Sequence, residues 1–260
     1  MAKTDHVEAV DLYYAIGLPP AKAIAYLKDK GYVISWRWQD VWQRAQAKAF
    51  TVAGVTQQDV LEDIRAAVDD ALKNGTTLST FEKNLKPILQ RKGWWGRHAQ
   101  TDKETGEMFG KPLDPYRLKT IYQTNMQTAY MAGRYKSQIE NVDNRPFWEY
   151  VAILDGRTRP SHRALDGKIF RYDDPFWDSL YPPNGFGCRC RVRVRSQEDM
   201  NEQSLYLSKS DGKLETVERM VSKRTGEMAE VTGYRDPLTK KLFTPDVGWS
   251  YNAGKAWLDK

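Results

Sequence analysis

The sequence predicts an α+β fold with a helical N-terminal part, a long central helix and a small antiparallel sheet with long loops. Apolar residues recur at helical spacing through residues 1–92, and one unbroken helical pattern occupies 114–140. Beyond Pro146 the apolar segments are short and are separated by turns rich in glycine and proline. These observations divide the chain into a helical region (1–92), a hairpin or linker (93–113) and a mixed domain (114–260).

Start and stop signals mark the helices of the N-terminal region. Two prolines precede segment 21–30 and a glycine follows it, which is the usual placement of these residues at helix ends. Thr56 and Asp59 form an approximate capping pair before a second segment at 60–75, which an Asn-Gly pair ends, and a third amphipathic segment occupies 80–92. Residues 93–113 are polar and rich in glycine, which favours a hairpin or a long loop.

The central helix is predicted to begin at Asp114-Pro115 and to end near Glu140. Glycine inside a helix is unfavourable unless another backbone comes close, so we expect a close approach at Gly133. After the break at Pro146, the pattern predicts strands at 147–154, 168–172 and 189–195. Between them it predicts a short helix near 158–166 and a loop at 175–187.

The segment 196–244 has few apolar residues and many Lys, Glu, Ser and Gly. We expect an exposed excursion there, with a helix near 215–221 and a mobile hairpin. The closing segment 248–257 regains aromatic residues and is predicted to pack back on the core.

Composition excludes several classes of protein. Hydrophobic residues make up 40% of the 260 residues, so a disordered chain is not expected. Every apolar run is shorter than a membrane-spanning helix requires, so we expect no membrane association. Two cysteines cannot form a disulfide scaffold, which favours synthesis in a reducing cytosol. The formal net charge is a modest +6.

Both cysteines and one of the three histidines lie within residues 155–195. Cys188 and Cys190 share one side of an extended segment, and a disulfide between them would be strained. Together with His162 they suit a tetrahedral zinc ion whose fourth ligand is not evident, the candidates being Asp155, Asp166, His98 and water.

Two other interpretations of the cysteines and His162 remain open. Cys188 could be a small buried apolar residue beside a hydrogen-bonded turn histidine. A Cys–His nucleophilic pair would need a carboxylate such as Asp155 or Asp166 to orient the imidazole. We expect no catalytic residue and no obligatory cofactor, with zinc as the candidate ion.

Arginines alternate with smaller residues at the end of this block. Because side chains in a strand alternate between its faces, one face is predicted to carry a row of guanidinium groups. We expect this row to bind an anionic partner, with a simple solvated surface as the alternative. Its members are Arg189, Arg191, Arg193 and Arg195.

Six segments form a distinctive set: residues 155–162 (DGRTRPSH), 165–167 (LDG), 181–184 (YPPN), 188–190 (CRC), the preceding helix 122–134 and the closing motif 245–254 (PDVGWSYNAG). Together these motifs resemble the phage Mu F-like minor head proteins of tailed bacteriophages. They follow the family's order over residues 114–254. The signature loop comprises Asp155, Arg157, Thr158, Arg159, His162, Asp166 and Gly167.

The resemblance implies a minor capsid protein that acts in procapsid assembly and in DNA packaging or ejection. Its implied partners are the portal protein, the major capsid or scaffold protein, and double-stranded DNA bound without sequence specificity. Its implied location is inside the virion head near the portal, and the host cytoplasm during assembly. The alternatives are a Cys/His-dependent hydrolase, a toxin-like transferase, or a zinc-stabilised binding module.

Overall fold

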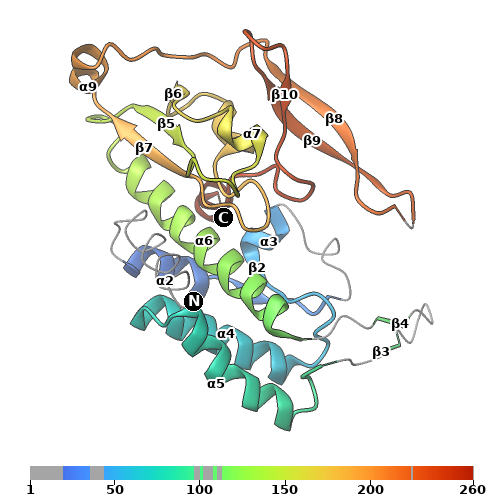
Figure 1. The fold of residues 1–260 in the computed structure, drawn as a ribbon. Helices are drawn as coiled ribbons and strands as arrows, with labels where there is room; N and C mark the ends of the chain where they lie inside the picture. The colour runs from blue at the N-terminus through green and yellow to red at the C-terminus, as the bar shows by residue number, and fades with distance from the viewer. Residues whose placement is uncertain are drawn as a thin grey trace. The chain divides into compact units, whose positions relative to one another are not determined.

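The computed structural model describes residues 20–35, 44–96, 100–101, 108–109, 113–223 and 225–259. The chain forms two compact units, residues 1–133 and 134–260, and the boundary between them falls inside the long central helix. Helices dominate the first unit and short antiparallel sheets characterise the second, which confirms the predicted α+β class (Figure 1). Among the described residues, no helix combines the length and apolarity that crossing a bilayer requires.

The first unit is built around two amphipathic helices, α4 (Gln58–Asn74) and α5 (Leu78–Arg91). Gly75 adopts a left-handed conformation that ends α4, and the Thr77 side chain caps α5 by accepting from the backbone N–H of Thr80. The buried residues follow helical spacing and are Val60, Leu61, Ile64, Val68, Ala71 and Leu72 of α4 and Phe81, Leu85 and Leu89 of α5.

Shorter elements complete the first unit. They are α2 (Pro20–Lys28), the parallel pair β1 (Gly31–Tyr32) and β2 (Ala49–Phe50), α3 (Arg44–Lys48), and the antiparallel pair β3 (Gln100–Thr101) and β4 (Met108–Phe109).

Helix α6 (Pro115–Ile139) is the predicted central helix. At its start the backbone N–H of Arg117 donates to Asp114 Oδ1 at 2.7 Å. A Cβ atom at Gly133 would lie 2.9 Å from the backbone nitrogen of Ala23 in α2. The close backbone approach expected at this glycine is therefore present, and alanine there would force the two helices apart.

The second unit contains a three-stranded antiparallel sheet in the order β6-β5-β7. Its strands are β5 (Phe147–Val151), β6 (Ile169–Arg171) and β7 (Arg191–Arg195). The register pairs Trp148 with Val194 and Glu149 with Arg193. The predicted short helix is α7 (Pro160–Arg163). The predicted loop 175–187 contains one helical turn that the sequence did not suggest, α8 (Phe176–Leu180).

Aromatic side chains fill the core on one face of this sheet. Phe170 and Phe176 stack with ring centroids 4.0 Å apart, and Trp148 lies 5.8 Å from Trp177. The closing segment packs back as predicted, since Trp249, Tyr251 and Trp257 are buried. Helix α10 (Ala253–Leu258) approaches α6 so closely that a Cβ at Gly254 would clash with the side chain of Tyr135.

The segment 196–244 differs from expectation. After α9 (Gln197–Glu202), it forms a sheet of β8 (Leu214–Met220), β9 (Met228–Arg235) and β10 (Leu242–Phe243). The helix expected near 215–221 is wrong, because seven residues of β8 pair in register with β9. Strand β8 is largely exposed, as predicted for the excursion, but β9 buries Val231 and Tyr234. Tyr234 lies 5.5 Å from Phe170, which ties this sheet to the aromatic core.

Candidate functional site

The loop that follows β5 is shaped by the carboxylate of Asp155. It accepts hydrogen bonds from the Arg157 backbone N–H at 3.0 Å and from the Thr158 hydroxyl at 3.1 Å. The Thr158 hydroxyl also lies against the carbonyl of Ile153. Arg189 donates to the same carboxylate at 2.6 Å and, with these hydrogen bonds, holds the pKa of Asp155 well below its usual value. Asp155 therefore connects the loop before α7 to the segment before β7.

The other end of the loop returns to β5. Asp166 Oδ1 accepts from the Ala152 backbone N–H at 2.7 Å, and the Gly167 N–H donates to the Tyr150 carbonyl at 2.8 Å. Gly167 has φ of 75°, a conformation that favours glycine. With Pro160 in its first turn, α7 is fixed at both ends and directs His162 inward, where the residue is 4% exposed.

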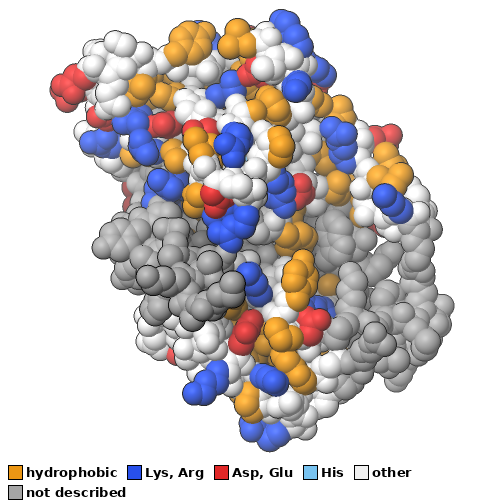
Figure 2. Space-filling view, in the orientation of Figure 1, with side chains coloured by type: hydrophobic (Ala, Val, Ile, Leu, Met, Phe, Trp, Pro, Cys, Tyr) orange, Lys and Arg blue, Asp and Glu red, His pale blue; other side chains and the backbone are white. Residues whose placement is uncertain are grey.

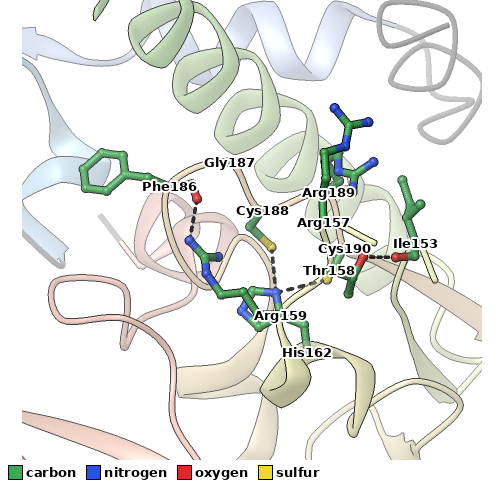
Figure 3. Close-up of a pocket in the computed structure, with 10 residues that line it drawn as sticks. All are labelled: Ile153, Arg157, Thr158, Arg159, His162, Phe186, Gly187, Cys188, Arg189 and Cys190. Atoms are coloured by element: carbon green, nitrogen blue, oxygen red, sulfur yellow. Dashed lines mark hydrogen bonds between the residues drawn. The ribbon is translucent and has the colours of Figure 1, made fainter. Parts of the chain in front are cut away.

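His162 meets both cysteines there (Figure 3). Its Nδ1 atom lies 3.7 Å from Cys188 Sγ and 3.4 Å from Cys190 Sγ, and the three candidate ligand atoms all lie within 4.8 Å of one another. Both thiols are free and buried. The structure therefore brings together the three residues that the sequence predicted as metal ligands.

The two thiols differ in acidity. Burial opposes ionisation of Cys188, but hydrogen bonds from Cys190 and His162 outweigh it and lower the pKa of the Cys188 thiol well below its usual value. The hydrogen bond to Cys188, together with burial, raises the pKa of the Cys190 thiol. The cluster thus favours one thiolate, and that thiolate is Cys188.

Within the described residues, the cysteines and His162 lack the carboxylate that would orient the imidazole in a nucleophilic triad. Neither Asp155 nor Asp166 orients the imidazole, because both carboxylates bond to the groups described above. His162 Nε2 is buried and has no hydrogen-bond partner within the part of the chain that the structure describes. The same two aspartates were candidate fourth metal ligands, and the residues that cluster around His162 do not include them. His98, the remaining protein candidate, lies outside the described residues.

The predicted arginine row is divided between internal ion pairs and solvent. Arg189 pairs with Asp155, and Arg195 pairs with Glu149 at 2.8 Å, with both side chains of this second pair less than 15% exposed. Arg193 is nearly half exposed, at 48%, and lies 3.8 Å from Glu149. Arg191 is half-buried, and burial lowers the pKa of its guanidinium. Binding of an anionic partner by this row stays a prediction, and Arg193 is its most accessible member.

A pocket of about 150 Å³ opens beside the cysteine–histidine cluster (Figure 3). Arg159 lies at this pocket and donates to the Phe186 carbonyl at 2.7 Å, and it pairs with Asp246 at 3.2 Å. The sequence placed Arg157 and Arg159 in the signature loop but did not predict that they line a pocket with Arg189. The lining residues are Ile153, Arg157, Thr158, Arg159, His162, Phe186, Gly187, Cys188, Arg189 and Cys190.

The family model and two curated relatives that match this chain all point to one protein family. Residues 62–193, about half of the chain, match the family described as Phage Mu protein F like protein. The chain is 44% identical, over 96% of its length, to the "Putative capsid assembly protein F" of Escherichia phage Mu. It is also 44% identical, over 86% of its length, to the Mu-like prophage FluMu F protein of Haemophilus influenzae. The matches cover 57% and 53% of these relatives, so the chain spans about half their length. No solved structure matches the chain significantly.

Proposed function

The chain belongs to the phage Mu protein F-like family, and from that premise we propose that it acts in head morphogenesis of a tailed bacteriophage. The observation that carries the proposal is the 44% identity, over nearly the whole chain, to a phage Mu protein whose name refers to capsid assembly. The role is that of a minor capsid component that works by binding other components of the head. Catalysis is not part of this role.

The proposal also includes where the protein acts and which head proteins it contacts. The protein is made in the host cytoplasm and enters the procapsid near the portal, where it contacts the portal protein and the major capsid or scaffold protein. The resemblance of the motifs in residues 114–254 supports this placement. In the finished virion it lies inside the head, where DNA is packed and later ejected.

Contact with DNA is the second part of the proposal. Figure 2 shows Lys and Arg side chains dispersed among acidic and hydrophobic ones over the face that is drawn, without a single basic patch. Such a surface suits weak contacts to phosphates that do not depend on base sequence. Arg193 is the exposed member of the β7 row and would contribute one such contact. Binding of this type weakens steeply as the salt concentration rises.

The test is a phage that carries this gene with a nonsense codon, grown in hosts with and without a complementing copy. We expect particles made without the protein to be misassembled or empty of DNA. In cryo-electron maps of complemented particles, we expect extra density inside the head at the portal vertex. Normal yields of filled, infectious heads without the protein would overturn the proposal, and density on the outer capsid surface would overturn the placement.

A further inference from the structure

We propose that His162, Cys188 and Cys190 bind one zinc ion whose fourth coordination position faces the arginine-lined pocket. The proposal adds an ion and a ligand site to the binding role and does not depend on that role. Two thiolates and an imidazole are the ligand types that zinc prefers in proteins. All three residues are buried, yet all three also line the pocket, so an ion held between them would be reachable from it.

The distances between the ligand atoms fit one tetrahedral ion. With ordinary zinc–sulfur and zinc–nitrogen bond lengths, the sulfur–nitrogen edge of a tetrahedron is about 3.5 Å and the sulfur–sulfur edge about 3.8 Å. The two observed sulfur–nitrogen distances are 3.4 and 3.7 Å, and no pair of ligand atoms is separated by more than 4.8 Å. Sub-ångström shifts of the side chains would therefore suffice to bind the ion.

Hydrogen bonding explains the same geometry less well. Depending on the tautomer, the Nδ1 atom of a neutral imidazole carries one lone pair or one N–H, so it makes one hydrogen bond at full strength, as acceptor or as donor. Here two sulfur atoms approach that one nitrogen from residues 188 and 190. A cation placed between the three atoms satisfies both thiolates and the lone pair together, which a proton cannot do.

The fourth ligand is expected to come from the pocket. The ten residues that line the pocket include no Asp or Glu, so its walls do not supply a carboxylate. They do include Arg157, Arg159 and Arg189. Among the described residues, these three arginines pair with two carboxylates, Asp155 and Asp246, neither of them in the lining. The excess positive charge favours an oxyanion near the ion. We therefore assign the fourth position to water in the free protein, exchangeable for a small oxyanion such as phosphate.

The first experiment measures zinc by elemental analysis of the full chain, purified under reducing conditions without chelators. We expect about one zinc per chain. The variants Cys188→Ser, Cys190→Ser and His162→Asn should each reduce zinc to background, while His6→Asn, a histidine outside the 155–195 block, should retain it. A folded wild-type chain that stays free of zinc after incubation with zinc and dialysis would overturn the proposal.

A second measurement remains informative if the variants do not fold. Cobalt(II) is loaded into the wild-type chain, and we expect a thiolate-to-cobalt charge-transfer band with the intense visible bands of a four-coordinate ion. Inorganic phosphate should then shift the visible bands in a saturable way. Arg157→Gln should weaken phosphate binding about tenfold, whereas Arg171→Gln, an exposed arginine outside the pocket, should not.

Two spectroscopic outcomes would contradict the assignment. Bound cobalt without a charge-transfer band would show that the thiols are not ligands, which overturns the site. Visible bands that do not respond to phosphate would show that the fourth position is closed to exchange, which overturns the open coordination position.

Discussion

Helices α4 and α5 and the loops around His162 are stabilised in different ways. The helix pair buries apolar side chains at regular spacing, with a glycine and a threonine at its ends. The loops of residues 153–190 depend instead on one aspartate, one threonine and a cluster of two thiols with an imidazole. Apolar burial depends little on pH or on chelators, whereas ion-paired carboxylates respond to pH and thiolate ligands of a metal respond to both. The comparison therefore predicts that the two regions respond to different perturbations.

The largest effect is expected in the helix pair. Phe81→Ala should lower the free energy of unfolding by about 3–5 kcal/mol, because it removes a fully buried ring. Chemical denaturation followed by circular dichroism measures this loss. The control Lys83→Ala lies on the exposed face of the same helix and should change stability by less than about 0.5 kcal/mol. Equal effects of the two substitutions would show that apolar burial does not stabilise the pair.

The next effect separates the two arginines that share Glu149. Arg195→Gln breaks an ion pair whose side chains are less than 15% exposed, and should lower stability by about 1.5–3 kcal/mol. Arg193→Gln should cost less than about 0.5 kcal/mol, because that side chain is half exposed. The order should reverse for DNA binding at low salt, measured by fluorescence anisotropy. If Arg195→Gln weakens DNA binding more than Arg193→Gln does in folded protein, then Arg193 is not the DNA contact and Arg195 is not purely structural.

A smaller effect tests the loop beside the cluster. Thr158→Val keeps the shape of the side chain but removes the hydroxyl that bonds to Asp155 and Ile153. It should lower stability by about 0.5–1.5 kcal/mol, since it removes one of the donors that the Asp155 carboxylate and the Ile153 carbonyl share. Thermal unfolding measures the loss, and Thr80→Val in α5 is a comparison on an exposed residue. An unchanged melting temperature for Thr158→Val would show that the Thr158 hydroxyl does not stabilise this loop.

The last prediction concerns the dependence of stability on pH and rests on Asp236. Burial would raise the pKa of this carboxyl, but the hydrogen bond from Lys168 and the backbone N–H of Thr239 outweigh it and lower the pKa to about 2. Because the folded pKa is below the unfolded value of about 3.9, the contribution is complete above pH 4. It is lost as the pH falls from about 4 towards 2. In Asp236→Asn, the free energy of unfolding should therefore fall less steeply between about pH 4 and 2 than in the wild type. Equal slopes in the two proteins would contradict the lowered pKa of Asp236.

The helices were predictable because their signals are local. Apolar spacing, the Asn-Gly pair and the proline before Tyr116 each act within a few residues, so α4, α5 and α6 lie close to their predicted ranges. Short elements were harder. Helix α8 has five residues within a segment rich in proline and glycine, and β8 carries charges that also suit a helix surface.

The site was predictable in composition but not in its contacts. The scarcity of Cys and His identified the cluster, because such groups rarely gather without a shared contact. The partners of the arginines depend on distant pairing instead. Arg195 meets Glu149 through the register of β7 on β5, and Arg159 meets Asp246 from the closing segment. These pairings are set by the fold, and the local pattern around each arginine contains no signal of them.

Hydrogen–deuterium exchange of the zinc-loaded chain, with and without a strong chelator, compares the two regions in one sample. If an ion holds the loops together, chelation should increase exchange in residues 153–190 and leave α4 and α5 as they were. Equal exchange in the loops before and after the metal is removed would show that the cysteine–histidine cluster holds them without it.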